Sequence, residues 1–320
     1  MMQQTLKLGS TNVEVPALGL GTWAWGDSLF WSYGKEYGAP DLEQAFQASL
    51  DHGVPFFDTA EIYGLGESEK LLGRFMQQAQ QPVLIATKYM PLPWRFMASS
   101  VHEALSDSLK RLQVSQVALY QVHQPFDFFM GQSTLLEALA EEVQRGRIAA
   151  VGVSNYSAEQ MREAHGILAK RGVPLAVNQV KYSLLARQIE TNGILDTARE
   201  LSITILAYSP LAQGLLTGKY TAETNQSPTG ARWLDPRFSR SGLQKLEPLL
   251  RALREIGERR DRTPAQVALN WLIAQGNVIP IPGAKNARQA AQNAGALGWS
   301  LEAEEIERLG QCSSDYLKSA

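Results

Sequence analysis

The chain has 320 residues, of which 44% are hydrophobic and 19% are charged, a balance that argues against a disordered protein. Thirty Lys and Arg against 32 Asp and Glu leave a net charge of −2, which does not indicate nucleic acid or an anionic membrane as a partner. A single cysteine, Cys312, excludes an internal disulfide, and with only four histidines no metal site is expected. No run approaches about 18 apolar residues and no apolar leader opens the chain, so we expect a cytoplasmic protein.

Short apolar runs alternate with amphipathic segments along the whole chain. Eight of these runs are continuously apolar, which is typical of strands buried on both faces of a parallel sheet. The predicted strands are Ala17–Gly21, Pro55–Asp58, Val83–Thr87, Val117–Gln121, Ala149–Val153, Ala176–Gln179, Ile203–Ala207 and Val278–Ile281.

The segments between these runs have helical periodicity, and some carry helix start signals. Ser157 followed by Gln160 has the spacing of a capping box, and Pro264 suits a first helical turn. A further helix is expected to open near Lys285. The other predicted helices are Asp41–His52, Glu67–Gln78, Ala98–Leu112, Thr134–Arg145, Ala158–Lys170, Ile189–Leu201 and Thr263–Ala274.

Strands that alternate with helices in this way predict an α/β fold, a (β/α)₈ TIM barrel, with a doubly wound open sheet as the alternative. Thr5–Leu8 and Val13–Val15, separated by a short polar turn, predict a β-hairpin before the barrel. No linker-like break interrupts the composition, so residues 1–320 are expected to form a single domain. Two connections, near 22–40 and 211–242, are long enough to suggest functional loops on the rim.

Polar residues gather where the predicted strands end. Asp58 closes the second strand, Lys88 follows the third and His123 lies just past the fourth. Each has an ordinary structural explanation, but a barrel would bring all of them to one rim. A nearby ammonium would lower the pKa of a tyrosine hydroxyl, and a carboxylate would hold that ammonium in place. Tyr63 could then act as a general acid, with Lys88 and Asp58 as its electrostatic partners and His123 orienting a carbonyl oxygen.

Short motifs at the strand ends occur in a fixed order over nearly the whole chain. They are Phe56-Phe57-Asp58-Thr59-Ala60-Glu61-Ile62-Tyr63-Gly64, Gly66-Glu67-Ser68-Glu69, Leu71-Leu72-Gly73, Ala86-Thr87-Lys88, Tyr120-Gln121-Val122-His123, Gly152-Val153-Ser154-Asn155-Tyr156, Asn178-Gln179, Ala207-Tyr208-Ser209-Pro210-Leu211 and Ile281-Pro282-Gly283-Ala284-Lys285. This set of motifs resembles the aldo-keto reductases. The segment Gly21-Thr22-Trp23-Ala24-Trp25-Gly26 and the stretch from Pro282 through Trp299 resemble the plant-plastid and cyanobacterial members of that family.

The resemblance implies a barrel that binds NADPH at its carboxyl-end face and reduces aldehydes or ketones. It places the catalytic tetrad on Asp58, Tyr63, Lys88 and His123. The cofactor contacts that it implies are Gly21, Thr22, Trp23, Ser154, Asn155, Gln179, Tyr208, Ser209, Pro210, Leu211, Gly214, Leu216, Gly218, Lys219, Gly283, Lys285, Gln289, Gln292 and Asn293.

Among these contacts, Ser154, Asn155 and Gln179 match the family positions that hydrogen-bond the nicotinamide carboxamide, and such side chains offer both donors and acceptors. Tyr208 matches the aromatic residue that stacks on the nicotinamide ring. At the adenine end many relatives carry Arg and Glu where this chain has Gln289 and Gln292. The preference for NADPH therefore rests on Lys285, with Arg288 one turn further on as a second candidate cation.

Aromatic residues that follow strand ends are the candidates for the substrate pocket, with ordinary loop packing as the alternative. They are Trp23, Trp25, Trp31, Trp94 and Phe126. Lys35, Arg95 and Arg232 are the cations that could meet a charged substrate.

The sequence thus predicts an NADPH-dependent carbonyl reductase that acts on a small molecule, as a monomer or a weak oligomer. Two alternatives remain: a nucleotide-binding barrel subunit that regulates a partner protein, and a Schiff-base lyase with Lys88 as its nucleophile.

Overall fold

The computed structural model describes residues 5–79, 81–127, 129–223, 228, 232 and 234–319. Within these residues eight parallel strands form one sheet in the order β10-β9-β8-β7-β6-β5-β4-β3. The strands are β3 (Leu20–Gly21), β4 (Phe56–Asp58), β5 (Leu84–Tyr89), β6 (Leu119–Val122), β7 (Val151–Ser154), β8 (Leu175–Lys181), β9 (Thr204–Tyr208) and β10 (Val278–Pro280).

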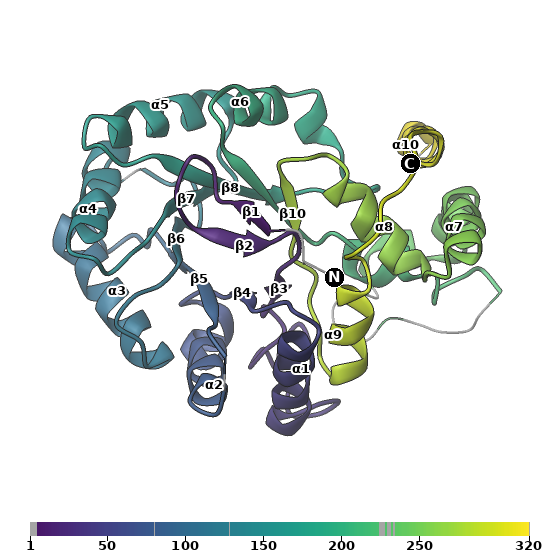
Figure 1. Cartoon of the computed structure of the whole chain (residues 1–320), viewed down its shortest axis with the longest axis horizontal. Helices are drawn as coiled ribbons and strands as arrows, with labels where there is room; N and C mark the ends of the chain where they lie inside the picture. The colour runs from purple at the N-terminus through teal and green to yellow at the C-terminus, as the bar shows by residue number, and fades with distance from the viewer. Residues whose placement is uncertain are drawn as a thin grey trace.

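The first and last strands of this order meet and close the sheet. The Gly19 N–H donates to the Pro280 carbonyl and the Gly21 N–H to the Pro282 carbonyl, both at 3.0 Å. A ring of helices surrounds the strands (Figure 1). The predicted (β/α)₈ barrel is therefore confirmed, and the open-sheet alternative is wrong.

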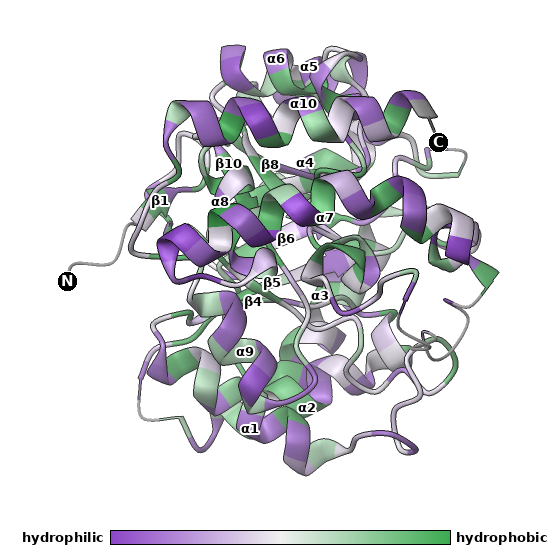
Figure 2. Ribbon diagram, turned by 90° about the vertical axis from the view of Figure 1, so that its right-hand side faces the viewer, coloured by the Kyte–Doolittle hydropathy of each residue, from purple (hydrophilic) through white to green (hydrophobic). Residues whose placement is uncertain are grey.

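The helices have polar outer sides and apolar inner sides, so purple and green residues alternate along their ribbons (Figure 2). In α1, for example, Leu42, Phe46 and Leu50 are buried against the barrel. No helix in the described part of the chain combines the length and apolar character needed to cross a bilayer. The helices are α1 (Ala39–Asp51), α2 (Glu67–Met76), α3 (Ala98–Leu112), α4 (Gln132–Gln144), α5 (Ala158–Ala169), α6 (Ile194–Glu200), α7 (Arg240–Arg260), α8 (Pro264–Ile273), α9 (Ala287–Ala294) and α10 (Ala303–Ser319).

Helix boundaries follow the sequence prediction closely, with the following differences. The segment predicted as one helix, Ile189–Leu201, is split into a 3₁₀ turn over Gln188–Glu190 and α6, because Gly193 takes a left-handed φ of 82° at the start of α6. Helices α7 and α10 were not predicted, and they pack against each other. The predicted loop 211–242 includes short 3₁₀ turns, and residues 224–227, 229–231 and 233 of it lie outside the described part.

The predicted hairpin is confirmed as β1 (Thr5–Lys7) and β2 (Glu14–Pro16), which pair antiparallel. It lies across the barrel (Figure 1) and is tied to the first residue of β9. The Gly9 N–H donates to Thr204 Oγ1 at 2.9 Å, and this hydroxyl donates to the Lys7 carbonyl at 3.2 Å. Its fully buried Leu8 and Val15 join the core inside the barrel. The hairpin thus covers the amino ends of the strands and leaves the carboxyl ends for a site.

Candidate active site

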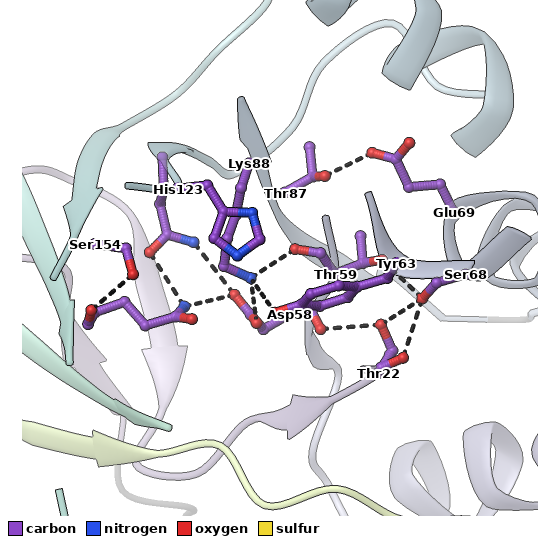
Figure 3. A network of polar contacts seen from close by, with 12 residues as sticks. Thr22, Asp58, Thr59, Tyr63, Ser68, Glu69, Thr87, Lys88, His123 and Ser154 are labelled. Atoms are coloured by element: carbon purple, nitrogen blue, oxygen red, sulfur yellow. Dashed lines mark hydrogen bonds and ion pairs between the residues drawn. The ribbon is translucent and has the colours of Figure 1, made fainter. Parts of the chain in front are cut away.

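The four side chains predicted to form the tetrad come together at the carboxyl ends of neighbouring strands (Figure 3). Asp58 ends β4, Lys88 lies near the end of β5, and His123 directly follows β6. Tyr63 begins a 3₁₀ turn, Tyr63–Gly66, that leads from β4 into α2. The Tyr63 and His123 rings meet edge to face, with their centroids 5.7 Å apart.

Lys88 is fully buried, and its ammonium is surrounded by oxygen atoms. Its Nζ donates to Asp58 Oδ2 at 2.6 Å, to the Thr59 carbonyl at 2.7 Å and to the Tyr63 hydroxyl at 3.4 Å. Burial by itself lowers the pKa of Lys88, but the Asp58 carboxylate and Tyr63 outweigh it, so that the pKa lies above its ordinary value. The site therefore holds Lys88 as a cation.

The expected acidification of Tyr63 is wrong as a net effect, although the Lys88 charge acts in the expected direction. Burial raises the pKa of the Tyr63 hydroxyl, and the opposing effect of the Lys88 charge does not overcome it. The reason is geometric: Asp58 already balances the ammonium at 2.6 Å, while the hydroxyl lies at 3.4 Å, near the limit of a hydrogen bond. Tyr63 thus keeps its proton at neutral pH.

His123 presents a neutral ring. Burial, together with the smaller effect of the nearby Lys88 charge, lowers the pKa of His123 to about 3. Its main-chain N–H is held by the Tyr89 carbonyl at 2.8 Å. The buried ring atom Nδ1 has no hydrogen-bond partner among the described residues. A neutral imidazole offers one N–H donor and one acceptor, so the ring can orient a polar ligand atom without adding charge.

Two buried amides stand behind Asp58. The Nε2 of Gln179 and the Nε2 of Gln121 donate to Asp58 Oδ1 at 2.7 Å and 3.2 Å. Gln179 was among the predicted site residues, whereas Gln121 was not. The signal that could have found Gln121 is its place at the end of a predicted strand, which it shares with Asp58 and Gln179.

Thr22 and Gly21 belong to the frame of the site rather than to its open face. Thr22 is fully buried, and its N–H and hydroxyl both donate to the Asp58 carbonyl, at 2.8 Å and 3.0 Å. Ser68 joins its hydroxyl to Thr22 at 2.7 Å and to Thr59 at 2.9 Å. Gly21 bridges to Gly283 at the barrel seam, where a Cβ on Gly21 would lie 2.9 Å from the Ile281 carbonyl oxygen.

The residues predicted to meet a carboxamide lie together at the ends of β7, β8 and β9. Asn155 adopts a left-handed φ of 62°, which turns the chain sharply after Ser154. Its Nδ2 donates to Ser154 Oγ at 3.1 Å, and its Oδ1 accepts from the Tyr208 hydroxyl at 3.1 Å. Ser154 Oγ in turn donates to the Gln179 carbonyl at 2.8 Å.

The stretch predicted to follow a pyrophosphate winds through a 3₁₀ turn after β9. Gly214 and Gly218 have φ values of 102° and 76°, which favour glycine. Pro210 and Leu216 are buried, so the Leu216 side chain is not open to a ligand. Lys219 is exposed, and its Nζ lies 4.7 Å from the centre of the Tyr220 ring.

Lys285 lies between aromatic rings before α9. Its Nζ donates to the Trp31 carbonyl at 3.0 Å and lies 5.0 Å and 4.4 Å from the centres of the Trp31 and Tyr37 rings. The Arg232 guanidinium lies 5.1 Å from the centre of the same Trp31 ring. Burial and the Arg232 charge lower the pKa of Lys285 to about 8. An anion would relieve this repulsion between like charges.

The other residues predicted at this end hold the loop in shape. Gln289 Oε1 accepts from the Lys285 N–H at 2.9 Å, and Asn293 Nδ2 donates to the Gly283 carbonyl at 3.2 Å. The main-chain carbonyl of Gln292 accepts from Gln266. Arg288 is exposed.

Three of the aromatic residues predicted to line a substrate pocket are open to solvent. Trp23 is 38% exposed, Trp94 66% and Phe126 45%. Trp25 is a correction: it is fully buried, its indole N–H donates to the Ala284 carbonyl at 3.0 Å, and its ring packs against Phe57. A side chain enclosed in this way cannot line a pocket.

Of the cations considered for a charged substrate, Arg95 is engaged within the protein. It forms a two-pronged ion pair with Glu61, at 2.5 Å and 2.9 Å. Arg232 lies at the Lys285 end, and Lys35 is exposed on its loop.

Several known proteins are similar to this chain in sequence. It is 40% identical to the chloroplastic pyridoxal reductase of Arabidopsis thaliana over an alignment of 331 residues. This alignment covers 99% of this chain and 87% of that protein. It is 39% identical over 297 residues to an uncharacterized oxidoreductase of Mycobacterium tuberculosis, covering 92% of this chain and 88% of that protein.

Solved structures agree with the sequence comparison. A glycerol dehydrogenase from Gluconobacter oxydans superimposes with a TM-score of 0.85 at 29% identity, covering 99% of this chain and 97% of that one. An aldo-keto reductase from Klebsiella pneumoniae in complex with NADPH gives a TM-score of 0.74 at 30% identity, covering 97% and 95%. The model of the Aldo/keto reductase family matches residues 17–314. The chain therefore belongs to the aldo/keto reductase family of oxidoreductases.

Proposed function

We propose that this enzyme uses NADPH to reduce aldehydes or ketones to alcohols, with Tyr63 as the proton donor. The observation that carries the proposal is the buried Lys88–Asp58 pair with the Tyr63 hydroxyl and the neutral His123 ring beside it. In the reaction, bound NADPH supplies the hydride that the carbonyl carbon accepts.

The residues present fit such a cofactor at both of its ends. Ser154, Asn155 and Gln179 offer the mixture of donors and acceptors that a carboxamide needs. Lys285 and Arg232 place positive charge around Trp31, which suits a phosphate group. The other cofactor contacts implied by the family resemblance, from Gly21 to Asn293, are part of the same proposal.

Three residues of the tetrad have separate roles in the protonation of the carbonyl oxygen. Because the pKa of Tyr63 is raised by burial, its hydroxyl arrives protonated and can donate as negative charge develops on the oxygen. Lys88 then stabilises the phenolate that remains, since its charge acts to lower the pKa of Tyr63. The neutral His123 ring can donate a hydrogen bond to the same oxygen and fix its direction.

We propose aromatic aldehydes as the substrate class, with pyridoxal as the first candidate. The named activity of the Arabidopsis relative supports this choice, because that protein is 40% identical to this chain. The exposed rings of Trp23, Trp94 and Phe126 provide flat apolar surface on the rim for such a ligand. Trp31 contacts Lys285 and Arg232, so we assign it to the nucleotide end instead.

The two alternatives gain no support from the geometry. A Schiff-base nucleophile must be a neutral amine, whereas Asp58 holds Lys88 as a cation with a raised pKa. A purely regulatory subunit has no need of a complete tetrad, which this chain assembles. A cytoplasmic location and a monomeric or weakly associated state stay predictions. The single cysteine accords with the predicted location, because disulfides are rare in the reducing cytoplasm.

The test is a fluorescence titration with NADPH and with NADH, followed by a panel of carbonyl compounds that includes pyridoxal and benzaldehyde. We expect tighter binding of NADPH and oxidation of NADPH that depends on added aldehyde. NADPH binding with no carbonyl-dependent oxidation would favour the regulatory role and contradict the proposal.

A further inference from the structure

Gln121 connects the two halves of the proposed site, although its side chain is fully buried. It is fully buried on β6, between Lys88 on β5 and Gly152 on β7 in the strand register. Its Nε2 donates to Asp58 Oδ1 at 3.2 Å, and its Oε1 accepts from Gln179 Nε2 at 3.2 Å. Gln121 therefore contacts both the tetrad and the predicted carboxamide site.

The direction of both amides follows from the chemistry of Asp58. Its Oδ2 is paired with the Lys88 ammonium at 2.6 Å, and a carboxylate only accepts hydrogen bonds. Both glutamines must therefore turn their nitrogen atoms toward Oδ1. Reversing the Gln179 amide would bring its oxygen against the carboxylate and would lose both of its hydrogen bonds, to Asp58 at 2.7 Å and to Gln121.

This arrangement leaves one end of the Gln179 amide for a ligand. The Nε2 group has two hydrogens, and Asp58 and Gln121 accept one each. None of the described residues donates a hydrogen bond to Gln179 Oε1. Gln179 can consequently offer the cofactor an acceptor but no donor, so the group that it meets must carry a hydrogen-bond donor, such as the N–H of a carboxamide.

A glycine on the neighbouring strand, Gly152, leaves space for the Gln121 side chain. A Cβ at Gly152 would lie 2.9 Å from Gln121 Cγ and 3.1 Å from Val177 Cβ. Glycine at this position lets the Gln121 side chain cross the barrel interior toward Asp58. The register and the small neighbour together fix where the Gln121 amide lies.

We propose that Gln121 is a positioning residue that holds the Gln179 amide so that only its oxygen faces the cofactor. The site then selects a dinucleotide whose nicotinamide-ring substituent carries an N–H donor. The proposal rests on the proposed use of NADPH. Gln121 itself touches neither cofactor nor substrate in this scheme.

The test measures binding to the ligand-free protein, with NADP⁺ and with 3-acetylpyridine adenine dinucleotide phosphate as probes. In the second probe a methyl group replaces the amide NH₂, so it cannot donate to Gln179 Oε1. The wild-type protein should bind NADP⁺ about tenfold more tightly, the usual consequence of leaving one buried polar group unpaired. In Gln121→Leu this preference should fall to about twofold, because the second Nε2 hydrogen of Gln179 loses its acceptor and can donate to the acetyl oxygen of the second probe.

Two further variants keep the test decisive. Gln132→Leu is the matched control, since Gln132 is also buried, with 9% exposure, but lies on α4 away from the tetrad; its preference should equal that of wild type. If Gln121→Leu does not fold, Gly152→Ala displaces the glutamine without removing it and should narrow the preference in the same way.

The outcomes separate this inference from the proposed function. A wild-type preference that survives in Gln121→Leu or Gly152→Ala would overturn the role of Gln121 and leave the proposed function standing. Equal binding of both probes by the wild type would also overturn it. A wild-type protein that binds neither probe would instead contradict the proposed use of NADPH.

Discussion

Replacing Lys88 with methionine keeps the volume of a fully buried side chain and removes its charge. Asp58, only 1% exposed, would then lose its 2.6 Å partner and remain as an unpaired buried carboxylate. Breaking a buried ion pair from one side costs about 3–5 kcal/mol. Asp58 keeps the amide hydrogen bonds from Gln121 and Gln179, so we expect a loss near the lower end, about 3 kcal/mol.

Urea unfolding followed by circular dichroism measures this loss. With an m-value of about 3 kcal/mol/M, the midpoint of Lys88→Met should fall by about 1 M. The double variant Lys88→Met/Asp58→Asn removes the unpaired charge as well and should recover part of the loss. Because the folded pKa of Lys88 is raised above 10.5, its stabilising contribution is complete below that pH and is lost as the pH rises through the folded pKa. The expected cost of an unpaired Asp58 charge would be contradicted if the free energy of unfolding of Lys88→Met lay within about 1 kcal/mol of wild type. It would also be contradicted if the double variant were no more stable than Lys88→Met.

The remaining predictions concern cofactor charge, the histidine and the rim. Since the pKa of Lys285 lies at about 8, its charge is present below pH 8, and the affinity for NADPH, measured by fluorescence titration, should fall as the pH rises through that value. Lys285→Met should remove this pH dependence and should lower the affinity for NADPH more than the affinity for NADH. With the pKa of His123 at about 3, kcat/KM should show no acid limb near pH 6.5, and such a limb that vanishes in His123→Phe would contradict the neutral ring. Trp25→Ala should lower the free energy of unfolding by about 3–5 kcal/mol, whereas Trp23→Ala should raise the KM for aromatic aldehydes with little loss of stability. The reverse pattern would contradict the placement of Trp25 in the core and of Trp23 at the substrate pocket.

Most of the framework could be predicted because barrel strands and their ends leave local signals. Continuous apolar runs predicted the strands to within a few residues, and polar side chains at their ends identified Asp58 and Lys88. Parallel strands bring such ends to one rim whatever the loops do. Helix α6 is shorter than predicted because a single backbone conformation at Gly193 outweighs the periodicity around it.

What could not be predicted depends on distances between residues far apart in sequence. The direction of the Tyr63 pKa results from burial competing with a charge that Asp58 already balances, and neither can be read from spacing. Trp25 follows a strand end as Trp23 does, yet one ring turns inward and the other outward. Arg232 approaches Lys285 only because two separate loops pack over Trp31.

In the proposed reaction the Tyr63 hydroxyl gives its proton to the carbonyl oxygen. The most direct test is the single-turnover rate of aldehyde reduction by Tyr63→Phe at saturating NADPH, with NADPH affinity measured on the same sample. We expect a rate about 10²–10⁴-fold lower than that of wild type and an unchanged dissociation constant for NADPH, as for the loss of a general acid. A rate within about threefold of wild type would contradict it, because even a modest general-acid contribution exceeds that factor.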